Sequence, residues 1–251
     1  MLIQGVGVHG CGWDPQVDAL RGRYTCLTFD NRGMGASQPV GAEITVAQMA
    51  EDCRALLDEL GWESAHIIGH SLGGAIAIEL ALSNRPRVRS LSLLCTFACG
   101  KACAPLNWRI LQLGLRTRLG TRNMRRRAFL GIILPPGATA GIDVDKTTSE
   151  LEPLFGHDLA DHPPIVSSQL RAIRTFDATE RLNQLAGIPT LVVSAEHDPI
   201  APPGAGRAIA NGIPGTQYVE LVNASHGVPI TEPETVNELL LRHLATVPAG
   251  H

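Results

Sequence analysis

Aromatic residues make up only 4% of this 251-residue chain, and charged residues only 18%. No apolar run approaches the ~18 residues that a membrane-spanning helix needs. The formal net charge of −3 gives no excess of one sign that would favour nucleic acid or an anionic membrane as a partner. The six cysteines form no CxxC pair and follow no zinc-site spacing. These absences argue against a membrane-spanning, nucleic-acid-binding or zinc-finger protein.

The first ten residues, MLIQGVGVHG, lack the basic stretch and long apolar segment of a secretory signal peptide. Most cysteines lie inside apolar segments, which is typical of buried free thiols in a reducing compartment. We therefore expect a cytoplasmic protein. The 44% of hydrophobic residues is ample for one large core.

Short β-branched or apolar runs alternate with longer helical patterns along the chain, which predicts a mostly parallel α/β sheet flanked by helices. Helices are expected over residues 46–60, 72–83 and 234–246, the first capped by Thr45 and ended by Gly61. The predicted strands are residues 1–6, 24–30, 64–69, 88–96, 188–196 and 215–225.

Residues 97–180 interrupt this alternation. They carry helical patterns but no strand character, and they are long for one connection between a strand and the next. We interpret them as a helical lid, called here the lid segment, inserted into a core made of residues 1–96 and 181–251.

Residues 69–73 read Gly-His-Ser-Leu-Gly, the G-x-S-x-G pattern of a nucleophile elbow. A sharp strand-to-helix turn strains the serine backbone and requires small neighbours two residues away. The helix that follows directs its amides at the place where negative charge develops. The simpler alternative is that Ser71 merely caps that helix. The preceding strand and the following helix favour a nucleophile.

A serine nucleophile needs a histidine base and an acid that orients the histidine. Functional groups of parallel sheets gather at the carboxyl ends of the strands. This rule selects Asp198, after TLVVSAEH, and His226, after YVELVNAS. Asp30 is the rival acid, but its neighbours NRGMGAS favour a role in holding a loop.

Five stretches resemble the α/β-hydrolase fold, in particular its lid-bearing esterases, lactonases and cofactor-free haloperoxidases: QGVGVHGCGWDPQ, FDNRGMGAS, GHSLGG, PTLVVSAEHDPIAP and NASHGVPITEPE. The resemblance spans nearly the whole chain. It implies Ser71 as nucleophile, Asp198 as acid and His226 as base, with the backbone amides of Val6 and Leu72 as the oxyanion hole. It implies no metal or other cofactor, and it excludes the chemistry of haloalkane dehalogenases, which need an aspartate nucleophile.

The chain departs from this family in two places. Gln4-Gly5 stands where the family usually has His-Gly, although the glutamine amide can still bind loop backbone. Relatives also carry about twenty residues before the first strand seen here, which form a β-hairpin at the sheet edge. Without that hairpin, residues 24–30 are expected to form an exposed apolar edge strand.

The expected reaction is two-step acyl transfer on small or medium esters or lactones. The same triad also suits a C–C bond hydrolase or a perhydrolase, and the scaffold suits a catalytically silent ligand-binding protein. Oligomeric state is not readable from the sequence.

The apolar residues Leu113, Phe129 and Ile133 are candidates for the acyl pocket or for the core of the lid segment. Trp13 is a candidate for the border of the site or for the protein core. Seven arginines of the lid segment are most simply a solvated face, and alternatively bind a substrate carboxylate: Arg109, Arg116, Arg118, Arg122, Arg125, Arg126 and Arg127.

Overall fold

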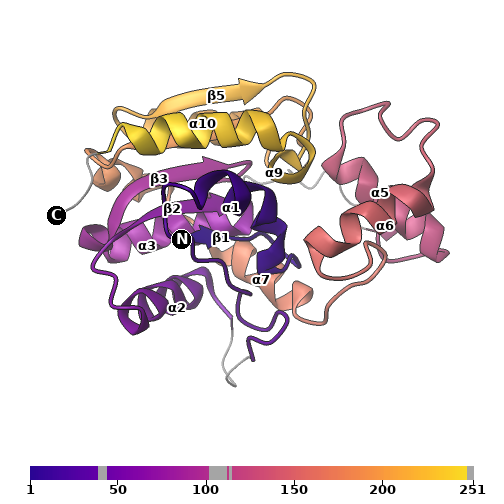
Figure 1. Cartoon of the computed structure of the whole chain (residues 1–251), viewed down its shortest axis with the longest axis horizontal. Coiled ribbons are helices and arrows are strands. Elements are labelled where there is room, and N and C mark those ends of the chain that lie inside the picture. Colours follow the sequence, from indigo (N-terminus) through magenta and orange to yellow (C-terminus); the bar gives the residue numbers. More distant parts are fainter. Residues whose placement is uncertain (39–43, 102–111, 113–114, 248–251) are drawn as a thin grey trace.

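The computed structural model describes residues 1–38, 44–101, 112 and 115–247. Within these ranges the strands form one sheet in the order β1-β2-β3-β4-β5, and every neighbouring pair is parallel. Sequence order therefore equals spatial order across the sheet (Figure 1). The strands are β1 (Leu2–Ile3), β2 (Ala65–His70), β3 (Val88–Leu94), β4 (Thr190–Ala195) and β5 (Gln217–Leu221).

The crossovers between strands place helices on both faces of the sheet (Figure 1). The first face packs against α2 (Val46–Glu59), α3 (Leu72–Ser83) and α8 (Pro203–Gly212), and the second against α1 (Asp14–Leu20) and α10 (Pro233–Ala245). Short helices η1 (Gly10–Trp13), η2 (Arg85–Arg87) and α9 (Val228–Thr231) lie in the connections. No helix in the described part of the chain is both long and apolar enough to cross a membrane.

Helix α3 is buried on almost every side. It lies between the sheet and α2, and nine of its twelve residues are buried. Its sequence, LGGAIAIELALS, is accordingly apolar all round rather than amphipathic. The helix that follows Ser71 is therefore fixed firmly in the core.

Helix α2 begins and ends where its sequence predicts. The Thr45 hydroxyl accepts a hydrogen bond from the Gln48 amide at 3.0 Å, which satisfies one free donor of the first turn. Gly61 follows the helix with a φ of 66°, a left-handed conformation that glycine adopts without strain. Both predicted caps are confirmed.

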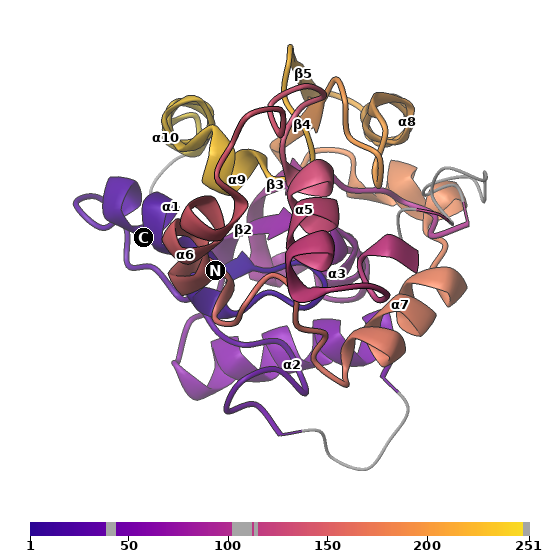
Figure 2. The same ribbon diagram turned by 90° about the vertical axis from the view of Figure 1, so that its right-hand side faces the viewer.

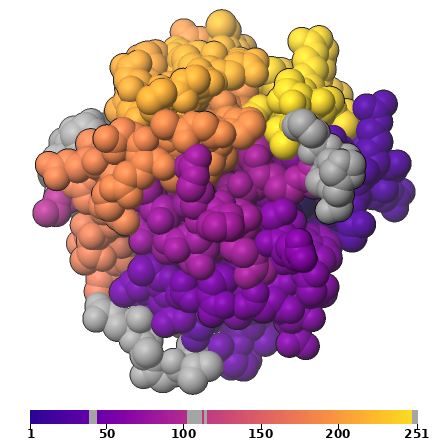
Figure 3. Space-filling model, turned by 90° about the vertical axis from the view of Figure 1, so that its left-hand side faces the viewer, coloured from indigo at the N-terminus to yellow at the C-terminus, as the bar shows by residue number. Residues whose placement is uncertain are grey.

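The lid segment contributes α5 (Arg122–Ile133), α6 (Val144–Phe155) and α7 (Val166–Thr175), and η3 (Thr179–Leu185) leads back to β4. Helices α5 and α6 share an apolar cluster separate from the two clusters on the sheet faces. They lie in front of the sheet in Figure 2. Figure 3 shows the side of the molecule opposite to that in Figure 2, where N-terminal and C-terminal parts of the chain lie next to each other.

The strand predicted over residues 24–30 was wrong for most of its length, because only Thr28 forms a bridge, to Leu2. The side chains still alternate as in a strand. Leu27 and Phe29 pack toward the first face, and Tyr24 and Cys26 toward the second. The two-residue β1 offers too short a partner for a longer ladder. Residues 24–30 are thus a half-buried segment packed against the sheet rather than the exposed apolar edge strand that we expected.

Candidate active site

The candidate residues lie just beyond the carboxyl ends of strands, four of them in connections and Leu72 as the first residue of α3. Val6 follows β1, Ser71 follows β2, Asp198 follows β4 and His226 follows β5. Because all the described strands are parallel, these connections meet at one edge of the sheet. Cys95, which the sequence did not single out, holds the equivalent position directly after β3.

The turn between β2 and α3 has the geometry that its glycines predict. Ser71 has φ 55° and ψ −119°, a strained conformation for a residue with a side chain. A Cβ on Gly69 would overlap the carbonyl of Gly73, and a Cβ on Gly73 would overlap the carbonyl of Ile3. The Thr96 hydroxyl donates to the Ser71 carbonyl at 2.6 Å and helps to hold the turn. The alternative that Ser71 caps α3 is wrong, because its side chain makes no capping hydrogen bond.

The structure brings Ser71, His226 and Asp198 into one chain of hydrogen bonds. The Ser71 Oγ lies 3.0 Å from His226 Nε2, and His226 Nδ1 lies 2.7 Å from Asp198 Oδ2. All three residues are less than a tenth exposed. If Nδ1 carries the ring proton and donates it to Asp198, Nε2 is free to accept a proton from Ser71.

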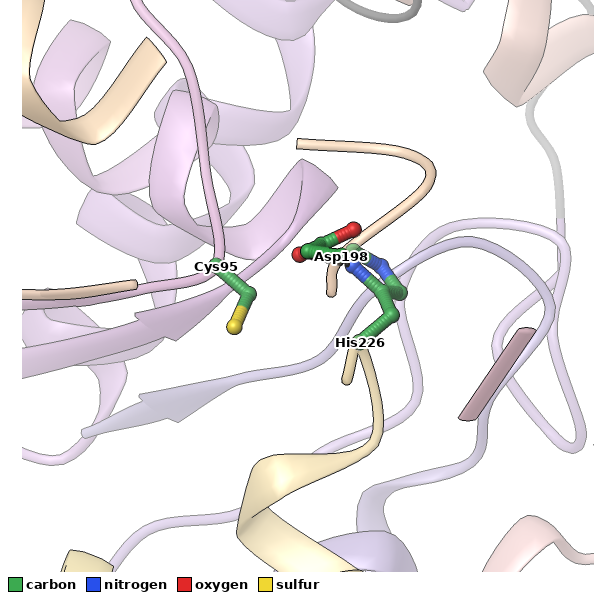
Figure 4. A group of neighbouring side chains, drawn as sticks. All are labelled: Cys95, Asp198 and His226. Atoms are coloured by element: carbon green, nitrogen blue, oxygen red, sulfur yellow. Dashed lines mark hydrogen bonds and ion pairs between the residues drawn. The ribbon is translucent and has the colours of Figure 1, made fainter. Parts of the chain in front are cut away.

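Asp198 is held by several donors besides His226. The amides of Ile200 and Ala201 donate to its Oδ1 at 2.7 and 2.8 Å. Figure 4 shows that Cys95 and His226 lie beside it, and the potential ligand atoms of these three residues are all within 4.8 Å of one another. Burial, and then the nearby Asp198, raise the pKa of the Cys95 thiol, so this sulfur stays protonated.

Cys95, Asp198 and His226 also form the one group with potential metal-ligand geometry in the described part of the chain. The ring nitrogen and carboxylate that a metal would use are already bound to each other. A metal ion would also have to displace the thiol proton. The donor set therefore fits a hydrogen-bond network better than a metal centre.

His70, the residue before Ser71, connects the elbow to the loop of His226. Its Nε2 donates to the His226 carbonyl at 2.8 Å, and the two rings lie 4.9 Å apart. Burial, and then the charge on His226, lower the pKa of His70 to about 3. His70 is thus neutral at physiological pH, so this link is independent of pH there.

The amides predicted for the oxyanion hole are free to bind a ligand. Neither the Val6 nor the Leu72 amide donates to an acceptor within the described residues. Residues of the lid segment hold the loop after β1. Gln169 accepts from the Gly7 amide at 3.0 Å, and His157 Nε2 lies 2.7 Å from the Gly7 carbonyl.

A cavity of about 220 Å³ opens above Ser71. Its wall combines the loop after β1 with residues of the lid segment and is predominantly apolar. Phe129 and Ile133, both predicted as candidates for the acyl pocket, line it, whereas Leu113 lies outside the described residues. Its polar residues are Gln4 after β1, the site residues His70, Ser71 and His226, and four residues of the lid segment: Thr117, His157, Asp161 and His162.

No arginine lines this cavity within the described residues, and Arg109 lies outside them. Arg122 and Arg126 instead bind the buried carboxylate of Asp158, and Arg127 donates to the Thr139 carbonyl. The structure therefore gives no support to substrate-carboxylate binding by these three.

Two other sequence candidates have structural roles. Asp30 accepts a hydrogen bond from the Gly10 amide at 2.8 Å and lies 3.5 Å from His9, so it holds the loop after β1. Trp13 is fully buried in the core of the second face and does not border the cavity.

Sequence reasoning missed Cys95, Ser225 and His157. The rule that selects Asp198 from its place after a strand could also have found Cys95. Ser225 precedes the predicted base, yet nothing in the sequence shows which carbonyl its hydroxyl reaches. His157 lies far from the motifs, and only the fold brings it to Gly7.

A family model described as "Alpha/beta hydrolase family" matches residues 2–239. The chain belongs to this family. The agreement extends over the strands, the elbow and the lid segment, which together place the candidate site.

Named relatives show which chemistry accompanies this fold. The chain is 31% identical over 247 residues to a "Putative carbamate hydrolase RutD" of Azorhizobium caulinodans, covering 96% of this chain and 89% of that protein. A structure described as "Putative non-heme bromoperoxidase BpoC" from Mycobacterium tuberculosis is 27% identical with a TM-score of 0.84, and the match covers 99% of this chain and 92% of that chain. An enol-lactonase from Burkholderia xenovorans is 26% identical with a TM-score of 0.79 and covers 97% and 90%. These relatives support a hydrolase of this fold.

Proposed function

We propose that the chain is a serine hydrolase that cleaves small to medium carboxylic esters or lactones through an acyl-enzyme. The observation that carries the proposal is the hydrogen-bond chain from Ser71 through His226 to Asp198 at the floor of an apolar cavity. A protein that only binds its ligand needs neither the strained serine nor the buried acid.

In the proposed reaction His226 Nε2 takes the Ser71 proton while Ser71 Oγ attacks the substrate carbonyl. The resulting oxyanion accepts hydrogen bonds from the amides of Val6 and Leu72. His226 then gives its proton to the departing alcohol oxygen as the C–O bond breaks. Asp198 holds the ring and stabilises its charged form. In the second half, His226 takes a proton from water, the water oxygen attacks the acyl carbon, and Ser71 leaves as a hydroxyl.

The cavity supports neutral substrates of modest size. Its described wall carries no lysine or arginine to bind a carboxylate, and the carboxylate in that wall, Asp161, lies 3.8 Å from Arg122 outside it. Phe129 and Phe155, which meet edge to face at 5.2 Å, give it an apolar roof. We therefore expect short uncharged acyl groups to be preferred over dicarboxylate half-esters.

Carbamates are the second candidate substrate class. The relatives named as carbamate hydrolases are similar over nearly the whole chain. A carbamate carbonyl can enter the same geometry, because the amino group replaces only the first carbon of the acyl chain. Phenyl acetate and phenyl carbamate are a matched pair of nearly equal size for this comparison.

The test is hydrolysis of p-nitrophenyl acetate and butyrate by the wild type and by Ser71→Ala. We expect Ser71→Ala to lose at least about 10⁴-fold in kcat/KM, because no nucleophile remains. Ser92→Ala is the matched control. Ser92 is buried in β3, and its hydroxyl has no partner among the described residues, so this variant should keep full activity.

A fluorophosphonate probe gives an independent readout. It should label the wild type and Ser92→Ala at Ser71 and should fail to label Ser71→Ala. Activity that survives in Ser71→Ala, or a folded wild type that neither reacts with the probe nor hydrolyses any ester or carbamate, would contradict the proposal.

A further inference from the structure

The residues on either side of His226 are bound to the last turn of α5. Ser225, which is 1% exposed, donates its hydroxyl to the Ile132 carbonyl at 2.8 Å. The Gly227 amide donates to the Ile133 carbonyl at 3.2 Å. An α-helix cannot satisfy its last four carbonyls internally, so both bonds use acceptors that α5 leaves free. The loop of the predicted base therefore completes a helix of the lid segment.

The Ser225 hydroxyl also faces the loop that carries the acid. Its Oγ lies 3.3 Å from the carbonyl of His197, the residue before Asp198. The single hydroxyl proton is thus close to two acceptors, one on α5 and one beside the acid. Ser225 is the point where α5, the acid loop and the base loop meet.

The same turn of α5 is part of the cavity wall. Both Ile132 and Ile133 line the cavity above Ser71. The fit against the base loop is tight, since a Cβ on Gly227 would lie only 2.7 Å from the Cβ of Ile133. A ligand that presses on this wall acts on the residues whose carbonyls hold the loop of His226.

We propose that Ser225 is a positioning residue that couples the cavity wall of α5 to His226 and Asp198. The inference rests on the proposed serine hydrolase function, because it acts through the base of that reaction. Occupation of the cavity changes how α5 holds the loop of His226. The way the acyl group fills the cavity therefore changes kcat as well as KM. Specificity for acyl length then depends on Ser225, which lies outside the cavity wall.

The experiment compares Ser225→Ala with Ser92→Ala on p-nitrophenyl esters from acetyl to octanoyl. For the best substrate, we expect Ser225→Ala to lose about tenfold in kcat, the effect of one buried hydrogen bond, while KM changes less than about twofold. The dependence of kcat on acyl length should flatten in Ser225→Ala and stay as in the wild type in Ser92→Ala. Ser225→Cys, which keeps a weak donor of similar size, should lie between the wild type and Ser225→Ala.

Two outcomes would overturn the inference. Ser225→Ala could have the same kcat as Ser92→Ala, which would make the hydroxyl purely structural. Alternatively, kcat could fall by the same factor for every acyl length, which would remove the coupling to the cavity. If Ser225→Ala does not fold, the profile of Ser225→Cys decides between these results.

A measurement without turnover separates this inference from the proposed function. The proton between His226 Nδ1 and Asp198 should give a downfield ¹H NMR signal, and its exchange with water reports how firmly the ring is held. We expect exchange about tenfold faster in Ser225→Ala than in Ser92→Ala. If the folded wild type neither reacts with the fluorophosphonate probe nor hydrolyses any ester or carbamate, the proposed function fails. Equal exchange rates in the two variants would still overturn the positioning role.

Discussion

Two buried aspartates, Asp158 in the lid segment and Asp198 after β4, are each only 4% exposed but are held in different ways. Asp158 binds Arg122 and Arg126 and accepts from the Ala160 amide at 2.7 Å. Asp198 binds His226 and two backbone amides.

The partners of the two aspartates differ in whether they can take up or release a proton. A guanidinium keeps its charge at every working pH, so Asp158 forms a permanent ion pair that fixes α5 to the chain after α6. The imidazole ring of His226 has one nitrogen that can accept a proton while the other binds the carboxylate, so the partner of Asp198 can take part in a reaction. A buried carboxylate thus becomes functional when its partner is able to change protonation state.

In the comparison of the two aspartates, the largest expected effect comes from Asp198→Asn. The carboxamide N–H can donate a hydrogen bond to His226 Nδ1, which leaves the ring proton on Nε2 and blocks acceptance of the Ser71 proton. We expect kcat to fall by about 10³- to 10⁴-fold with little change in KM. Ester hydrolysis by Asp198→Asn and Asp158→Asn, measured side by side, tests this. An equal loss in the two variants would remove the distinction between the two aspartates.

Asp158→Asn should show the reverse pattern. The amide can still accept from the Ala160 amide, but Arg126 loses its buried counterion. We expect the free energy of unfolding to fall by about 1–2 kcal/mol, because Arg122 is half-exposed and recovers water contacts. Urea unfolding measures this loss, and kcat should stay within about threefold of the wild type. A variant as stable as the wild type would show that the ion pair contributes nothing net.

The smallest expected effect is the pH dependence of that stability difference. Hydrogen bonding to Arg126 lowers the pKa of Asp158 below its ordinary value of 3.8. Asp158 therefore binds a proton less readily in the folded state than in the unfolded state. The stability that the Asp158 carboxylate contributes is complete above its ordinary pKa and is lost as the pH falls toward its lowered pKa in the folded state. The difference in unfolding free energy between the wild type and Asp158→Asn should be constant above about pH 5 and shrink below about pH 4.

This measurement must compare the wild type with Asp158→Asn, because other groups also make the free energy of unfolding depend on pH. Burial lowers the pKa of His66 to about 4 and that of His70 to about 3. Both histidines stay neutral in the folded state while the unfolded chain takes up protons below about pH 6.5, so the overall stability already falls in that range. These contributions are the same in both proteins and cancel. A difference that stays constant down to the acid transition would contradict the assigned role of Asp158.

The sequence predicted the parts of the fold that depend on local rules. The Ser71 turn needs glycines at fixed offsets, and α2 needs a cap at each end, so both are visible in single residues. Strand order and the carboxyl-end rule were enough to select Asp198 and His226, which the structure brings together with Ser71.

The rest depends on contacts between distant residues. Residues 24–30 have the composition of a strand, but a strand also needs a partner of matching length, and β1 has only two residues. The arginines of the lid segment gave a charge pattern that could not reveal Asp158 as their partner. The bond from Ser225 to α5 joins residues 93 positions apart, and no local pattern records it.

The insertion point of the lid segment has a consequence for how readily this enzyme scaffold can change. β3 ends at Leu94 and β4 begins at Thr190, so adjacent strands are joined by a loop of about 95 residues. Closing a loop costs only about 0.6 kcal/mol more for each doubling of its length. The sheet is therefore nearly indifferent to how many residues lie between these strands. Segments of other lengths can be grafted here at little thermodynamic cost, provided that the graft returns two free helix-end carbonyls to Ser225 and Gly227. The graft must also replace the contacts of Gln169 and His157 with Gly7.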